Sequence, residues 1–166
     1  MIRFDRPQSL AGWHAIDDTV MGGISGSRIV LDPAGYAVFS GIVSFANNGG
    51  FASVRGPVIE PGRASIIAYE LTVRGDRKTC KLSLRVGQEF DGVSYQARFQ
   101  APGDWTRIRL PVRDFVPSWR ERSVPDAPAL DPTKVRQIGF LIADRQEGPF
   151  RLEIQSIKAL HEQAPA

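Results

Sequence analysis

Apolar and polar residues alternate along much of this chain, so that every second side chain is hydrophobic. The alternation is regular over residues 65–74, 79–86, 93–99 and 150–155. A period of two residues is that of an antiparallel β-strand with one face on the core and one in water. Residues 36–44 form a further predicted strand, in which Gly41 suggests a bulge. Residues 138–143 are apolar on both faces, which predicts a central strand.

Turn-forming residues separate these strands, and no window of ten residues has the period of a helix. Short strands at regular spacing predict an all-β fold in which two antiparallel sheets pack as a sandwich. The irregular segment at residues 114–132 contains four prolines, and segments of this length in compact domains are often functional. Neither a repeat nor a change of composition marks a second domain. The sequence therefore predicts one domain over residues 1–161 and a frayed tail over residues 162–166.

The composition is ordinary for a soluble globular domain. Of the 166 residues, 42% are hydrophobic and 23% are charged. The net charge is +3, and the basic residues are scattered singly rather than gathered in a block, which does not predict nucleic-acid binding. No apolar run approaches the ~18 residues of a membrane helix, and the N-terminus resembles neither a secretory nor a mitochondrial leader. We therefore expect a cytoplasmic protein without a membrane span.

The sequence offers little for catalysis. The single cysteine, Cys80, lies on the apolar side of a predicted strand and is expected to be an unreactive core thiol. His14 precedes Asp17 and Asp18 closely enough to suit a base or a metal, but a partly exposed histidine on an early strand is the favoured interpretation. The carboxylates of Asp17, Asp18 and Asp76 could serve glycoside chemistry or, as the favoured alternative, hold loops through bonds to backbone amides. We expect no enzyme and no cofactor, while a structural calcium stays open.

Two segments have neither a strand nor a helix period. Residues 17–25 and 47–55 each combine acids or amides with paired glycines and a large apolar residue. Paired glycines persist mainly where the backbone needs a positive φ or a close approach. We interpret both segments as loops of fixed shape that form a binding surface, with Asp17, Asp18, Met21 and Asn48 as contact residues. The alternative is two tight β-turns.

Arginines lie on the polar faces of the predicted strands, beside other polar or aromatic side chains. The residues concerned are Arg55, Arg74 and Arg98, with Asn48, Tyr95 and Gln96 near them. If these faces converge on one sheet, they form a groove of planar donors with an aromatic platform. The alternative is that Arg–Asp pairs fasten the glycine-rich loops to the sheet. Trp13 and Trp105 begin strands and are expected in the core, whereas Trp119 in the proline-rich segment is expected to contact a partner.

Several motifs together resemble the complex I intermediate-associated protein 30 family. They are Trp13 and residues 17–25, 39–41, 48–55, 74–76, 95–99, 114–118 and 148–154. The resemblance implies a galactose-binding-domain-like jelly roll, similar to carbohydrate-binding modules, in a bacterial member of the family. Two positions depart from the family pattern. Arg77 follows Asp76 where the family commonly has glycine, and residues 119–122 replace an Arg-Gly-Arg pattern, so the loop shape there stays open.

The mitochondrial members of this family act as assembly chaperones for the respiratory NADH:ubiquinone oxidoreductase. The resemblance therefore implies a protein-interaction or assembly role, with respiratory-complex subunits as partners. The two glycine-rich segments and residues 118–128 would form the contact surface. The alternative is a module for a small, carbohydrate-like ligand, which would use Asp18, Arg55, Arg74, Tyr95 and Gln96. A shared fold does not by itself imply sugar binding.

Overall fold

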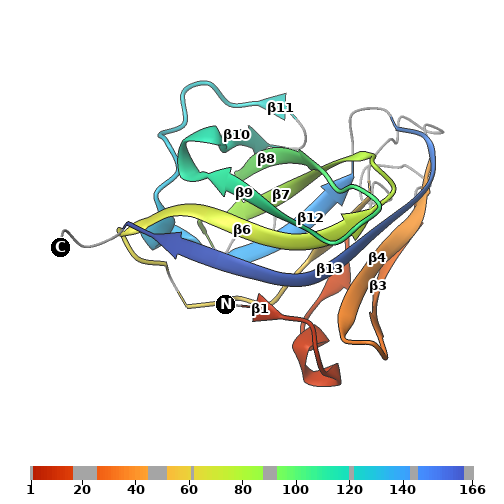
Figure 1. The fold of residues 1–166 in the computed structure, drawn as a ribbon. Helices are drawn as coiled ribbons and strands as arrows, with labels where there is room; N and C mark the ends of the chain where they lie inside the picture. Colours follow the sequence, from red (N-terminus) through yellow and green to blue (C-terminus); the bar gives the residue numbers. More distant parts are fainter. Residues whose placement is uncertain are drawn as a thin grey trace.

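The structure is a computed structural model, and it describes residues 2–16, 26–44, 52–60, 62–87, 93–119, 122–142 and 146–162. Two antiparallel sheets face each other, as the alternation predicted (Figure 1). The helices in the described ranges are single 3-10 turns: η1 (Pro7–Leu10), η4 (Val112–Asp114) and η5 (Pro132–Lys134). None of these turns is long or apolar enough to cross a membrane.

The first sheet, here called sheet A, forms the near layer in Figure 1. Its strands are, in order, β3 (Gly26–Asp32), β4 (Tyr36–Val43), β13 (Gly148–His161), β6 (Ile66–Gly75) and β9 (Thr106–Pro111). The short β1 (Ile2–Arg3) also pairs with β13. The 14-residue β13 is therefore the centre of sheet A, with β4 along one side and β6 along the other.

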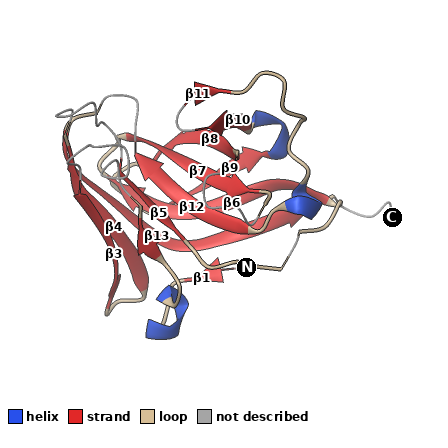
Figure 2. Cartoon of the chain, turned by 180° about the vertical axis from the view of Figure 1, so that it is seen from behind, coloured by secondary structure: helices blue, strands red, loops and turns tan. Residues whose placement is uncertain are grey.

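The second sheet, sheet B, packs behind sheet A and is seen from the other side in Figure 2. Its strands are, in order, β11 (Arg122–Ser123), β10 (Val116–Trp119), β8 (Ser94–Gln100), β7 (Thr79–Arg85), β12 (Gln137–Ile142), β5 (Ala52–Arg55) and β2 (His14–Ala15). The predicted central strand is confirmed, because β12 lies between β7 and β5 and is apolar almost throughout.

The core lies between the sheets and consists of the apolar side chains that alternate along each strand. Leu71 of sheet A and Leu82 and Phe140 of sheet B are fully buried in it. Trp13 closes one end, with its ring edge-on to Phe4 at 5.3 Å and stacked near Phe140 at 6.3 Å. Cys80 is buried as predicted, and its burial raises the pKa of the thiol to about 12.

Gly41 is not a bulge, contrary to the expectation from sequence. The pairing of β4 with β3 and with β13 runs through Gly41 without a shift in register. A Cβ at this position would instead collide with the Gly26 carbonyl oxygen and lie 2.7 Å from the Ser27 Cα. Glycine is required here because two strands approach closely.

The alternation in β6 is interrupted at its start. Tyr69 lies in the core, whereas Ile67 is 41% exposed, although the pattern grouped the two residues on one face. The pairing of β6 with β13 shifts between Leu160 and His161, opposite this point. The irregularity inserts one extra residue into β6. Because side chains alternate with a period of two, the residues before the insertion point to the opposite face, and Ile67 is turned outward.

The proline-rich segment is also more ordered than predicted. Within residues 114–132, β10 extends sheet B, since Val116 pairs with Gln96 and Ser118 pairs with Ser94. The Tyr95 hydroxyl donates a hydrogen bond of 2.8 Å to the Pro128 carbonyl, which fastens the returning chain. At the C-terminal end, the backbone N–H of Glu162 donates to the Ser65 backbone carbonyl at 2.7 Å. The remainder of the predicted tail lies outside the described residues.

Candidate functional site

Rows of outward-facing side chains cross the exposed face of sheet B. Residues directly opposite each other in antiparallel strands point to the same face. The strand register places Arg55 of β5, Gly139 of β12, Ser83 of β7 and Gln96 of β8 in one such row. A neighbouring row contains Ser53, Leu141, Lys81 and Arg98, and another contains Gln137, Arg85 and Ser94. We call these three rows the sheet B face.

Side chains in the middle of the sheet B face are little exposed, although they point outward. Lys81, Ser94 and Leu141 point away from the core, yet their exposed fractions are only 8%, 4% and 4%. Gly139 lies between Arg55 and Ser83 in its row, and it has no room for a side chain, because a Cβ there would lie 2.5 Å from the Val54 carbonyl oxygen. The centre of the face is therefore little exposed, and longer polar side chains lie around it.

The sheet B face is positively charged on its strands. Its outward residues include Arg55, Lys81, Arg85 and Arg98, and none of the described residues in these rows is a carboxylate. Lys81 and Arg98 lie directly opposite each other. All four residues also take part in contacts within the chain. The arrangement suits a ligand that brings carboxylates or carbonyl oxygens.

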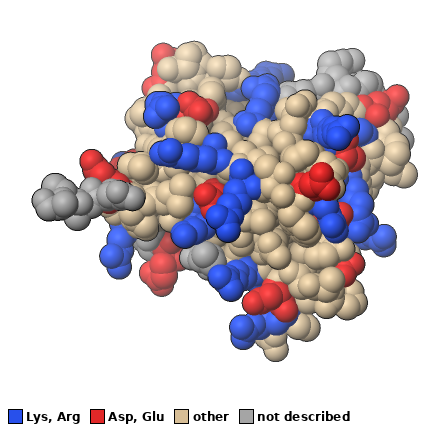
Figure 3. Space-filling model, viewed as in Figure 1, with Lys and Arg blue, Asp and Glu red and all other residues tan. Residues whose placement is uncertain are grey.

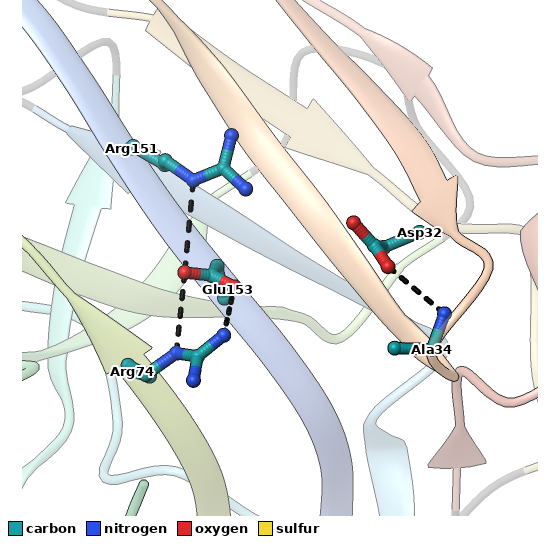
Figure 4. A network of polar contacts seen from close by, with 5 residues as sticks. All are labelled: Asp32, Ala34, Arg74, Arg151 and Glu153. Carbon is teal, nitrogen blue, oxygen red and sulfur yellow. Dashed lines mark hydrogen bonds and ion pairs between the residues drawn. The ribbon is translucent and has the colours of Figure 1, made fainter. Parts of the chain in front are cut away.

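A different polar cluster lies on the outward face of sheet A. The Arg74 Nη2 binds the Glu153 Oε2 at 2.7 Å, and the Arg74 Nε donates to the other carboxylate oxygen at 3.3 Å (Figure 4). The Arg151 Nε lies 3.6 Å from the same carboxylate. The Arg74 guanidinium is also covered by aromatic rings, with its Cζ 4.6 Å from the Trp105 centroid and 5.4 Å from that of Tyr36. Figure 3 shows this side of the molecule, with acidic side chains among the basic ones.

The titration of this cluster follows from its contacts. Burial acts to raise the pKa of Glu153, but hydrogen bonds from Arg74 and Tyr36 and the nearby arginine charges outweigh it, so the pKa is lowered. Burial and the Glu153 carboxylate raise the pKa of the Tyr36 phenol. The hydrogen bond to Glu153 raises the pKa of Arg74. Every group thus keeps its ordinary charge at neutral pH, which indicates a structural ion cluster.

Asp76 holds a turn, in agreement with the favoured alternative for this carboxylate. Its Oδ1 accepts the backbone N–H of Lys78 at 3.2 Å, and its Oδ2 accepts that of Arg151 at 2.9 Å. The next residue, Arg77, has a φ of 68°. A left-handed φ is the conformation that glycine adopts without cost. The loop that departs from the family pattern at Arg77 therefore keeps a glycine-like backbone.

The structure brings together some of the predicted site residues and separates others. Arg55 and Gln96 share one row of the sheet B face, and Arg98 lies on the same face. Arg74 belongs to sheet A, so the condition for a groove that contains all three arginines is not met. Asp17, Asp18, Met21 and Asn48 lie outside the described residues.

The predicted aromatic contacts also change. Tyr95 is not a surface platform, because the residue is only 4% exposed and its hydroxyl donates to the Pro128 carbonyl. Trp105, expected in the core, lies over Arg74 on the outward face of sheet A. Trp119 ends β10 opposite Arg122 and is 39% exposed.

Sequence reasoning missed Lys81, Ser83 and Gly139 as members of the sheet B face. The alternation of β7 already marked Lys81 and Ser83 as outward residues, so a signal for them existed. Gly139 lies within an apolar run, and the sequence contained no signal that would have identified it. His14 is exposed, as expected, and its Nδ1 lies 3.1 Å from the Gly12 carbonyl. In the part of the chain that the structure describes, no three His, Cys, Asp or Glu side chains are grouped as metal ligands.

Several solved structures with the same fold are carbohydrate-binding modules. The family 11 module of a cellulosomal cellulase from Clostridium thermocellum has a TM-score of 0.72 and 13% identity, over 96% of this chain and 94% of that chain. The family 11 module from Clostridium thermocellum in complex with a β-1,3-1,4-mixed-linked tetrasaccharide has a TM-score of 0.70 at the same identity and coverage. These likenesses show the galactose-binding-domain-like jelly roll that the resemblance implied.

Sequence comparison identifies relatives more directly. An uncharacterized protein of Schizosaccharomyces pombe is 25% identical over 195 residues, which cover 99% of this chain and 86% of that protein. Residues 2–154 match the family described as Complex I intermediate-associated protein 30. Because this match spans nearly the whole sandwich, the chain belongs to the complex I intermediate-associated protein 30 family.

Proposed function

We propose that this chain is a non-catalytic binding protein that holds a segment of a partner protein on the sheet B face. Family membership supports a role in assembly, because the family is named for its association with intermediates of complex I. Subunits of such intermediates are accordingly the partners we propose.

The observation that carries this proposal is the group of basic side chains on the sheet B face. A partner segment with acidic side chains would meet Arg55, Arg85 and Arg98 on this face. Arginine forks bind carboxylates in a bidentate manner. The described outward residues in the three rows include no aromatic ring, and aromatic stacking is thus not available from these rows. Partner binding accounts for the charge of the face better than sugar stacking does.

Site-specific photocrosslinking tests this assignment. A photoreactive phenylalanine at Ser83, in the middle of the sheet B face, is compared with one at Thr72, a half-buried position on the outward face of sheet A. In extracts of the native organism, we expect a discrete crosslinked protein from position 83, identified by mass spectrometry, and none from position 72. Crosslinking that is equal at both positions, or that occurs only at position 72, would contradict the proposal.

Binding of a carbohydrate is the second candidate function. It is favoured by the likeness to a module whose structure contains a mixed-linked tetrasaccharide and by the exposed Trp119 at the end of β10. A ligand that binds only the folded state raises the melting temperature. The mixed-linked tetrasaccharide should therefore raise the melting temperature of the natural chain and have a smaller effect on Trp119→Ala. No increase at concentrations well above millimolar would remove the support for this candidate.

A further inference from the structure

A concave feature lies on sheet A, away from the sheet B face. It is a hollow of about 860 Å³ where β3, β4 and β13 meet, with Arg28, Ser40, Ile42 and Arg151 among its lining residues. The volume is in the range of small-molecule sites, which are about 300–1,000 Å³.

The strand register places two arginines on either side of one hydroxyl. Ser40 of β4 pairs with Arg28 of β3 and with Arg151 of β13. The three side chains therefore point to the same face in one row. Adjacent strands lie about 4.8 Å apart, so the two arginine Cα atoms are separated by roughly 10 Å. Two side chains of this length can both reach a group placed above Ser40.

Both guanidiniums have N–H donors available for a group bound above Ser40. Arg28 is exposed, and the described residues provide its side chain with no hydrogen bond or ion pair. Arg151 directs only its Nε to Glu153, at 3.6 Å. Figure 4 shows its two terminal nitrogens turned away from Glu153 and toward β4. Glu153 is itself bound by Arg74 through both oxygens, so one carboxylate is shared between two arginines and offsets only part of their charge.

The rest of the wall is small or apolar. Ile42 is 61% exposed beside Ser40. Its partner across the strands is Gly26, where an added Cβ would meet nothing within 4 Å. Space is therefore open next to an apolar side chain. The lining residues contain two positive charges and no carboxylate.

We propose that this hollow binds a small molecule through an oxyanion group, which is a phosphate, a sulfate or a carboxylate. The oxyanion lies above Ser40 and accepts hydrogen bonds from Arg28 and Arg151, and an apolar part of the molecule packs against Ile42. Guanidinium groups bind oxyanions by charge-assisted, often bidentate hydrogen bonds. The site lies on the opposite sheet from the sheet B face and does not depend on the proposed partner binding.

Amide chemical shifts in an NMR titration with inorganic phosphate, at constant ionic strength, test this site. We expect saturable shifts at Arg28, Ser40, Ile42 and Arg151, with separate titrations of sulfate and citrate ranking the three oxyanions. Arg28→Gln should weaken binding by about tenfold or more, because it removes a charge-assisted donor. The matched control is Arg107→Gln, on β9 of the same outward face, which should leave the affinity unchanged.

The design separates specific binding from general screening of charge. Arg28→Gln breaks no described side-chain contact, so its spectrum should otherwise match that of the natural chain, which verifies folding. Shifts that do not saturate with any of the three anions would overturn the proposal. Equal weakening by Arg28→Gln and Arg107→Gln would overturn it as well. Neither result would affect the proposed partner binding on the sheet B face, which crosslinking from position 83 tests separately.

Discussion

The guanidinium of Arg74 lies under the ring of Trp105, with 4.6 Å between the Arg74 Cζ and the ring centroid. The ring covers a cation that is already bound to Glu153. Trp105→Ala removes this cover and the edge contact with Tyr36 at 5.3 Å, so we expect the free energy of unfolding to fall by about 2 kcal/mol. Trp105→Phe keeps an aromatic face and should cost less. Urea denaturation measures both, and equal losses would show that the ring face does not matter.

Acid should weaken the fold through Glu153. Its carboxyl has a pKa below the ordinary value of 4.5, because the hydrogen bonds from Arg74 and Tyr36 and the arginine charges outweigh burial. A carboxyl with a lowered pKa contributes its full stabilisation above the unfolded pKa and loses it as pH falls through the folded pKa. We expect the stability of the natural chain to fall below pH 4.5, and Glu153→Gln to show a shallower decline over the same range. Parallel curves from urea melts would contradict this linkage.

Gly41 should not tolerate any side chain. Its added Cβ would collide with the Gly26 carbonyl, which is backbone and cannot rotate away. We expect Gly41→Ala to lower the free energy of unfolding by about 2–3 kcal/mol. Gly26→Ala is the matched control, since a Cβ there has open space, and its effect should stay within about 0.5 kcal/mol. A Gly41→Ala protein as stable as the control would show that β3 and β4 can separate without cost.

Arg77 is a site where glycine should stabilise the chain. Its φ of 68° is costly for a residue with a Cβ, and its backbone N–H donates to the Ala101 carbonyl at 3.0 Å. Arg77→Gly relieves the strain and keeps this bond, so we expect a gain of about 0.5–1 kcal/mol. Arg77→Ala removes the same charge but keeps the Cβ. Similar gains from both variants in thermal melts would assign the effect to charge instead of backbone strain.

Cys80 should be protected from thiol reagents in the folded chain. Burial raises the pKa of its thiol to about 12, and the side chain is 3% exposed. We expect labelling at pH 8 to be slower by about a thousandfold in the folded chain than in urea, because the thiolate fraction falls with the pKa. Rapid stoichiometric labelling of the folded chain would show that the strand β7 opens readily.

The alternation of side chains predicted the strands because a period of two involves only residues close together in the sequence. Leu82 and Leu84 face the core as the pattern indicated, and Cys80 lies beside them. Strands of two to four residues, such as β2, β5 and β11, are too short to display a period. They form because longer strands offer them an edge, which is information from distant parts of the chain.

The site was harder to predict for a related reason. A period of two tells whether a side chain points in or out, but a sandwich has two outward faces. Arg74 and Arg98 both occupy polar positions of regular strands, yet β6 belongs to sheet A and β8 to sheet B. Tyr95 is different, because the alternation placed it on the apolar face although it was proposed as an aromatic platform of the groove. The hydroxyl finds its partner at Pro128, 33 residues further along the chain.

The position of β13 has a consequence for the order of events during synthesis. Its partners β1, β4 and β6 all precede it in the chain, and two of them, β4 and β6, are joined only through it. The ribosome must therefore synthesise the chain as far as residue 161 before β13 can join the two halves of sheet A. Until then the nascent chain carries apolar strand faces without their shared neighbour, and contacts this distant in sequence form slowly. Protection by a holding chaperone is thus most valuable during translation of the last strand.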